Sequence, residues 1–171
     1  MNKKALVLFV LFSTVLLSSC ILGGGKGMIS DDSDKKADAR IEQILEVLAN
    51  NNKDGLKAMF SEQALSEAKD FDGQKDYLFD FFQGAVESWE RTGLTAPMYI
   101  ENGKKAVELI SWYTVTTDKE TFRFFVIDYS VDTFNPDNVG LYTLRVIKKT
   151  DEETQFTYWQ DMEIAGIYKP E

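Results

Sequence analysis

The sequence contains no histidine, and it has one cysteine and three prolines among its 171 residues. The absence of histidine excludes Ser–His–Asp and Cys–His catalysis, and with a single cysteine the usual zinc-ligand sets are also excluded. One cysteine cannot form a disulfide within the chain. We therefore expect no bound metal and no other cofactor, and we assign no catalytic residue.

Basic side chains are also in the minority: the sequence has 19 Lys and Arg and 28 Asp and Glu, which gives a formal net charge of −9. Proteins that bind nucleic acid need clustered basic side chains to neutralise phosphates, so we do not expect a nucleic acid partner. Hydrophobic residues make up 44% of the chain. This length and composition are sufficient for one domain with its own core.

The chain begins with two lysines, Lys3 and Lys4, followed by the apolar run ALVLFVLFSTVLL over residues 5–17. A helix of that length spans about 20 Å, whereas the hydrocarbon core of a bilayer is roughly 30 Å thick. The run is too short to cross a membrane and has the length of a signal-peptide core.

The four residues Leu17-Ser18-Ser19-Cys20 resemble a bacterial lipobox. In a lipobox the cysteine sulfur receives diacylglycerol, and cleavage then makes the cysteine the first residue of the mature protein. The resemblance implies a lipoprotein signal peptide over residues 1–19 and a lipid anchor with fatty acyl chains, such as palmitate, on Cys20. The alternative is an ordinary secretory signal in which the cysteine is incidental.

A diacyl anchor holds a protein on a membrane durably. Loss of Lys3 and Lys4 with the signal peptide changes the formal charge from −9 to −11, so the lipid rather than the protein surface must attach the chain. We expect the protein on the extracytoplasmic face of the cell membrane. Residues 20–36 are rich in Gly, Asp, Ser and Lys, which predicts a flexible tether before a single domain over residues 37–171.

Helical spacing characterises the first half of this domain. Ile41, Ile44, Leu45 and Leu48 recur at i, i+3, i+4 and i+7, and two short helical segments follow, with expected caps at Asp54 and Ser61. A further helix is predicted to open at Asp72-Gly73 and to end at Gly84. The second half alternates with period two and predicts strands over 85–92, 105–117, 121–133, 139–149 and 155–168, the last with a bend at Gly166. Helices followed by consecutive strands predict an α+β fold, with N-terminal helices packed on a curved, mostly antiparallel sheet.

This order resembles the nuclear-transport-factor-2-like, or SnoaL-like, family, in which a curved sheet and helices form a cone. The helix with Ile41-x-x-Ile44-Leu45 and the segment DGLKAMFS over residues 54–61 carry the broad resemblance. A narrower resemblance, to a domain-of-unknown-function family found in lipoproteins of Gram-positive bacteria, rests on three segments: Phe81-Phe82 with Val86-x-x-Trp89, Phe124-x-x-Ile127-Asp128-Tyr129-x-x-Asp132-Thr133, and Val139-Gly140-Leu141-Tyr142. It covers residues 37–168 and implies no established activity.

The cone fold implies a pocket between helices and sheet, for which we expect Trp89, Trp112, Tyr129, Asp128 and Glu108 as ligand-binding residues. The two carboxylates stand out because acidic residues are disfavoured within strands. A buried pair of carboxylates has one raised pKa and can serve as a general acid or base.

Asp128 has two interpretations. Either its face of the strand, with Phe122, Phe124 and Val126, is buried and Asp128 is paired, or the opposite face, with Phe125 and Ile127, points inward. The expected partners are the loop backbone over residues 135–138, Arg123 or Arg145.

We therefore predict a non-catalytic binding module for a small apolar ligand or an envelope protein. The alternative is an enzyme of the SnoaL or ketosteroid-isomerase type that uses Asp128 or Glu108. The resemblance also leaves open a structural role as a homodimer, because related cones pair through exposed sheet faces.

Overall fold

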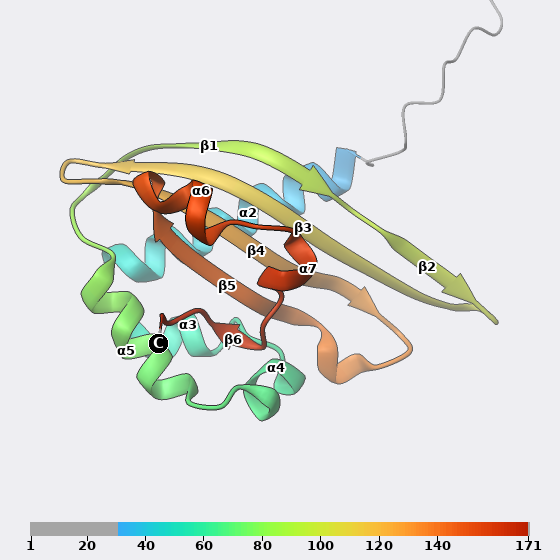
Figure 1. Cartoon of the computed structure of the whole chain (residues 1–171). Helices are drawn as coiled ribbons and strands as arrows, with labels where there is room; N and C mark the ends of the chain where they lie inside the picture. Colours follow the sequence, from blue (N-terminus) through green and yellow to red (C-terminus); the bar gives the residue numbers. More distant parts are fainter. Residues whose placement is uncertain (1–30, 171) are drawn as a thin grey trace, which may run out of the picture.

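A computed structural model describes residues 31–170. The predicted signal peptide, Cys20 and the first part of the predicted tether lie outside the described residues. The described chain is α+β, with helices first and a curved, mostly antiparallel sheet after them, as predicted (Figure 1).

The helices that precede the sheet are α2 (Asp31–Ala49), α3 (Lys53–Lys57), α4 (Glu62–Glu67) and α5 (Phe71–Phe81). The strands are β1 (Val86–Thr95), β2 (Met98–Glu101), β3 (Lys104–Thr117), β4 (Thr121–Asp132), β5 (Gly140–Lys148) and β6 (Gly166–Ile167). Short helices fill the late connections: η1 (Pro136–Asn138), η2 (Lys149–Asp151), α6 (Glu152–Gln155) and α7 (Trp159–Met162).

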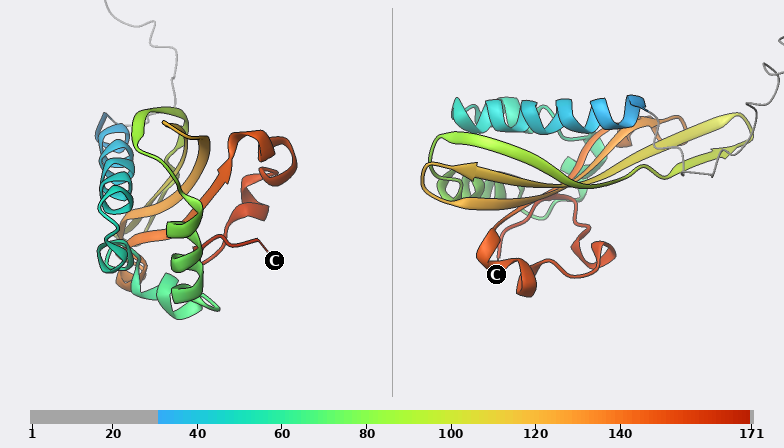
Figure 2. Two further views of the ribbon diagram at one scale, coloured as in Figure 1. Left: turned by 90° about the vertical axis from the view of Figure 1, so that its left-hand side faces the viewer. Right: turned by 90° about the horizontal axis from the view of Figure 1, so that it is seen from above.

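The strand order is β1-β3-β4-β5-β6, with β2 also paired to β3. All pairings are antiparallel except that of β5 with β6, which is parallel. Strand β2 and residues 104–107 of β3 form a hairpin, here called the β2–β3 arm, whose tip projects beyond β4 and the rest of the sheet (Figures 1 and 2).

Both faces of the central strand β4 are buried. Phe122 and Phe124 belong to the main core, which the sheet shares with the N-terminal helices, whereas Phe125 and Ile127 pack with Met162 of α7 on the other face. Figure 2 shows the corresponding layers, with α2 on one side of the sheet and the C-terminal segment on the other. The face predicted to bury Asp128 is therefore buried, and so is the opposite one.

The N-terminal helices form where the apolar spacing predicts them, with two of the three caps at other residues. Ser61 caps α4 as predicted, through its side chain and the backbone N–H of Ala64. Helix α3 is capped by Asn52 rather than Asp54, and α5 by Asp70 rather than the Asp72-Gly73 pair. In both helices the capping oxygen accepts from a glycine N–H three residues later, so the cap is the Asn or Asp side chain two residues before the expected one.

The helix α2 begins inside the segment predicted as a tether. Residues 31–36 are helical, Ser33 is buried, and Asp34 lies 2.6 Å from Arg91 of β1. Acidic residues in a first helical turn are favoured by the helix dipole, and Arg91 supplies a partner that composition alone does not reveal. The tether prediction is therefore wrong for residues 31–36.

The prediction of one long strand over 155–168 is also wrong. This segment contains α7 and only two strand residues, which pair with Thr143 and Leu144 of β5. The Thr143 hydroxyl donates to the carbonyl of Ile164 at 2.6 Å and fixes the segment beside β5. Met162 and Phe156 instead pack over Phe125 on the outer face of β4, because burying this apolar surface away from water is favourable.

Candidate functional site

Asp128 is paired with a residue of helix α2. Its Oδ1 lies 2.9 Å from Nε of Arg40, and the Asp128 side chain is only 6% exposed. Burial raises the pKa of the Asp128 carboxyl, and the Arg40 guanidinium opposes that rise. Of the two interpretations made for this residue, the paired one on a buried face agrees with the structure.

The predicted partners of Asp128 are wrong. Arg123 is bridged to Glu152 at 2.9 Å, and Arg145 donates to the carbonyl of Gln155 at 2.9 Å. Both arginines project from the sheet face that α6 covers, because side chains alternate along a strand. The loop over residues 135–138 is instead held by Asp132, whose Oδ1 accepts from the backbone N–H groups of residues 134 and 135.

Further polar side chains lie between α2 and the sheet. Arg91 contacts Asp38 at 3.4 Å in addition to Asp34, and Tyr113 is completely buried close to them. Burial raises the pKa of the Tyr113 hydroxyl to about 12. Sequence reasoning missed this group, although the spacing of four between Asp34 and Asp38 marks one helix face that a basic strand residue can meet.

Glu108 and Tyr129 are neighbours in the register of β3 and β4. Burial raises the pKa of Glu108, the nearby Glu163 raises it further, and a hydrogen bond with Tyr129 lowers it. Asp128 is opposite Leu109 and so projects from the other face of the sheet. The two strand carboxylates therefore do not form a pair.

The two tryptophans predicted to bind ligand also lie on different faces. Trp89 packs edge-on against Tyr113 at 5.8 Å between ring centroids, next to the main core. Trp112 lies 5.4 Å from Phe125 in the cluster with α7. The five predicted ligand residues thus do not surround one cavity, although Asp128 and Tyr129 share a pocket of about 280 Å³ beside α2.

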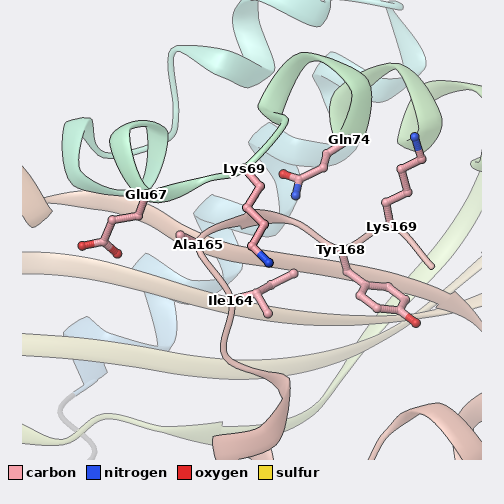
Figure 3. Close-up of a pocket in the computed structure, with 7 residues that line it drawn as sticks. All are labelled: Glu67, Lys69, Gln74, Ile164, Ala165, Tyr168 and Lys169. Atoms are coloured by element: carbon pink, nitrogen blue, oxygen red, sulfur yellow. The ribbon is translucent and has the colours of Figure 1, made fainter. Parts of the chain in front are cut away.

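A larger cavity, of about 680 Å³, opens between α4, α5 and the C-terminal segment (Figure 3). Its lining combines charged, amide, aromatic and aliphatic side chains: Glu67, Lys69, Gln74, Ile164, Ala165, Tyr168 and Lys169. Figure 3 shows Lys69 and Ile164 near the middle, Glu67 at one end, and Tyr168 and Lys169 at the other. We refer to it as the α5 cavity.

Hydrogen bonds fix the C-terminal wall of the α5 cavity. The Gln74 side-chain oxygen accepts from the N–H of Ile167 at 3.2 Å, and the N–H of Tyr168 donates to the carbonyl of Leu144 at 2.9 Å. Gly166 has a φ of +92°, and a Cβ there would lie 2.7 Å from the Gln74 oxygen. A side chain at position 166 would therefore break the contact that holds this wall.

The charges of the α5 cavity are separated along its length. Lys69 and Lys169 are exposed, and neither is ion-paired within residues 31–170. Glu67 accepts from Tyr142 at 2.6 Å and from Gln63 at 2.8 Å, and both bonds lower its pKa, so it stays ionised. Lys69, near the middle, and Lys169, at the end opposite Glu67, can each hold an anionic group, and the ring of Tyr168 offers apolar contact.

Sequence reasoning missed the α5 cavity because its two walls are far apart in the chain and one of them was predicted as a strand. Gly166 was the one residue of the cavity region singled out beforehand, as a bend. Arg145 adds to the rigidity of this wall, since its guanidinium carbon lies 3.6 Å from the centre of the Tyr168 ring.

Over residues 31–170, no three side chains of the metal-binding types gather closely enough to hold an ion. None of the helices in that range is both long and apolar enough to cross a membrane.

Comparison with known proteins gives one result that bears on identity. No curated protein matches the chain. Residues 43–149, which run from the last turns of α2 to the residue after β5, match a family described as a domain of unknown function, DUF5104. Because the match covers more than half of the sequence, the chain belongs to the DUF5104 family.

Proposed function

We propose that this chain is a bacterial lipoprotein, held on the extracytoplasmic face of the cell membrane by a lipid on Cys20. The observation that supports the anchor is the combination of Lys3 and Lys4, the 13-residue apolar run and the Leu17-Ser18-Ser19-Cys20 motif. A diacyl anchor suits a chain whose mature formal charge is negative, because such a chain gains little from anionic lipid head groups.

Membrane fractionation of cells that express the full chain tests this anchor. In cells supplied with labelled palmitate, wild type should appear in the membrane fraction as a labelled, cleaved chain, whereas Cys20→Ala should take up no label and keep residues 1–19. A Ser18→Ala variant is the matched control, because it leaves the acceptor sulfur in place. Equal labelling of wild type and Cys20→Ala would contradict the anchor.

We further propose that the domain is a cone of the nuclear-transport-factor-2-like type. Support comes from the order of helices before strands and from the curved sheet with α2 and α5 on one face (Figure 1). The space between them contains the main core, including the fully buried Leu56, Tyr113 and Phe124. A ligand is therefore better sought beside the cone than within this packed region.

The α5 cavity is the observation that carries our proposal for the domain, which is non-catalytic binding of a small molecule. Lys69 and Lys169 provide two cations, and Ile164, Ala165 and the ring of Tyr168 provide apolar surface. These groups fit a ligand with an apolar body and an acidic group, a modification of the purely apolar ligand predicted from sequence. Glu67 at the far end is held ionised by two donors, so it is poorly suited to transfer protons.

Native mass spectrometry of the full lipoprotein, released in detergent, tests this proposal with octanoate as the probe. Wild type should bind one octanoate, and the Lys69→Gln/Lys169→Gln variant should bind it at least tenfold more weakly. Lys119→Gln is the control, because Lys119 is exposed at the β3–β4 turn and does not line the cavity. Equal binding by all three proteins, or by none, would contradict the proposal. The same spectra report whether the protein is a homodimer.

A second candidate function is acid–base catalysis by Glu108. The raised pKa that burial and Glu163 give this carboxyl, together with its contact to Tyr129, is the arrangement that favours it. Isomerisation of a β,γ-unsaturated ketosteroid, followed by absorbance, tests it. Activity that disappears in Glu108→Gln would place the enzyme function ahead of the binding module.

A further inference from the structure

The β2–β3 arm exposes three consecutive large apolar side chains. Met98, Tyr99 and Ile100 are 52%, 59% and 68% exposed, and all four residues of β2 are exposed. Natural sheets usually protect edge strands with charge, proline or a covering segment. A run of apolar side chains on a projecting edge strand therefore indicates a contact with something apolar.

The apolar surface continues onto the loop after β4. Phe134 is 39% exposed, and Nζ of Lys104 lies 5.9 Å from the centre of its ring. The N–H of Thr133 donates to the carbonyl of Lys105 at 2.8 Å, which holds this loop against the arm. Aromatic and aliphatic side chains thus lie beside lysines at one end of the molecule.

Basic side chains from α2 join this end. Lys36 lies 2.7 Å from Asp32, and Lys36, Lys35 and Lys105 together lower the pKa of the Asp32 carboxyl. The four lysines of this end, counting Lys104, are all exposed. Three of them lie near Asp32, and Lys104 is opposite Glu101 in the register of the arm. Four lysines at one end are a local concentration of positive charge in a chain with a formal charge of −9.

Helix α2 begins above the base of the arm. Ala37, near the start of the helix, packs in a buried cluster with Val107 and Leu109 of β3. Figures 1 and 2 show the first turn of α2 and the projecting arm on the same side of the molecule. The point where the described chain starts is therefore close to the arm.

The length of chain between Cys20 and this point limits the distance to the membrane. Residues 21–30 are ten residues, which span at most about 35 Å when fully extended. Flexible chains of that length reach roughly 17 Å on average. A lipid on Cys20 thus keeps the end of the domain that carries the arm next to the bilayer.

We propose that the β2–β3 arm inserts into the interfacial layer of the membrane and orients the domain on it. Met98 and Ile100 enter the acyl boundary, Tyr99 lies at head-group level, and Lys104 and Lys105 extend toward lipid phosphates. The inference rests on the proposed lipid anchor, because an arm of this size adds a second, weaker contact to a membrane that the anchor has already reached.

The geometry of the arm favours a bilayer over a protein strand as its occupant. A strand added along the free edge of β2 would satisfy its backbone groups but would leave both faces of the arm in water. Met98 and Ile100 share one face, and Tyr99 lies on the other. Immersion in a membrane interface covers both faces at once.

Spin labelling of the full lipoprotein tests the inference. Lipidation consumes the thiol of Cys20, so Ile100→Cys carries the free thiol that takes a nitroxide label. The protein is reconstituted in vesicles of phosphatidylethanolamine and phosphatidylglycerol, and collisions with oxygen and with a water-soluble nickel chelate are compared. Tyr158→Cys is the control, because Tyr158 is 80% exposed and lies in the C-terminal segment on the other face of the sheet.

We expect the ratio of oxygen to nickel accessibility to be at least fivefold higher at position 100 than at position 158. Equal ratios in vesicle-bound protein would overturn the inference while leaving the anchor intact. If the label at position 100 is immobilised without vesicles and the protein has twice the mass of one chain, the arm binds a second copy of the chain instead of the membrane. Labelling of the wild-type chain itself would show a free Cys20 thiol, and the proposed anchor would then fail first.

Discussion

Nε of Arg40 in α2 and Oδ1 of Asp128 in β4 lie 2.9 Å apart, which joins the first helix to the central strand of the sheet. The Asp128 side chain is 6% exposed and that of Arg40 is 23% exposed. The carboxylate therefore has less water to solvate its charge and depends more on its partner than the guanidinium does. Removing one partner of a buried pair leaves the other charge without compensation, and the two removals should therefore be unequal.

Arg40→Gln should lower the free energy of unfolding by about 3 kcal/mol at pH 7, because it leaves the buried Asp128 carboxylate without its cation. Asp128→Asn should cost less, since Arg40 can turn toward water. The double variant should recover most of the Arg40→Gln loss. Urea unfolding of the four proteins measures the coupling, and additive single losses would show that the pair contributes nothing.

Glu108→Gln should stabilise the protein at neutral pH. Burial and Glu163 raise the pKa of Glu108, so the folded state binds this proton more tightly than the unfolded chain does. The stability that wild type draws from this group is present below the ordinary glutamate pKa of 4.5 and is lost as the pH rises through the folded pKa. A glutamine does not titrate and avoids that loss.

The expected gain is roughly 1 kcal/mol at pH 7 and close to zero at pH 4. Glu101→Gln is the control, because Glu101 is exposed at the end of the arm. Thermal unfolding at both pH values measures the difference. A loss of stability at pH 7 would mean that Tyr129 holds the ionised form of Glu108 more strongly than burial opposes it.

Gly140→Ala should destabilise the fold by about 3 kcal/mol. Gly140 has a φ of +125°, and a Cβ there would lie 3.0 Å from the carbonyl oxygen of Met59 and 3.1 Å from the backbone nitrogen of Ser61. Those backbone atoms bond Leu141 and join the α3–α4 connection to β5, so they cannot easily move.

Gly103→Ala provides the matched control. Gly103 also has a positive φ, of +78°, but nothing lies within 4 Å of its Cβ position. Its cost should be only the backbone strain, about 1 kcal/mol. Denaturant unfolding measures both variants. Similar losses in the free energy of unfolding would show that the close approach at Gly140 does not affect stability.

Chains that begin at residue 31 and at residue 37 should differ in stability. The shorter one lacks the 2.6 Å contact of Asp34 with Arg91 and the buried Ser33. We expect its melting temperature to fall by about 5 °C, which corresponds to roughly a kcal/mol for a domain of this size. Identical melting temperatures would show that residues 31–36 add no stability to the domain, as the tether prediction held.

The sequence predicts those elements whose own periodicity carries the information. The spacing of Ile41, Ile44 and Leu48 is enough to place the second half of α2, and alternation is enough to place β3 to β5. Alternation could not identify the partner of Asp128, because both faces of β4 are buried and the partner comes from a helix far along the chain. That choice is made by tertiary packing.

The strand prediction for the C-terminal segment was wrong for a related reason. Its apolar residues are spaced for a strand, yet Met162 is needed to cover Phe125, and only Gly166 and Ile167 remain to pair with β5. The α5 cavity depends on this segment and on α5, so no local pattern could reveal it. The lipobox proposed at Leu17-Ser18-Ser19-Cys20, in contrast, depends only on neighbouring residues and stays a prediction from the sequence.

The mass of the N-terminal peptide of the mature protein tests the central claim, the lipid anchor on Cys20, most directly. The full chain should be expressed in a bacterium that lipidates its own lipoproteins, extracted with detergent and digested. Our account predicts a peptide that begins at Cys20 and carries a diacylglyceryl group on its sulfur. A mature chain that begins at another residue, or at Cys20 with a free thiol, would contradict it.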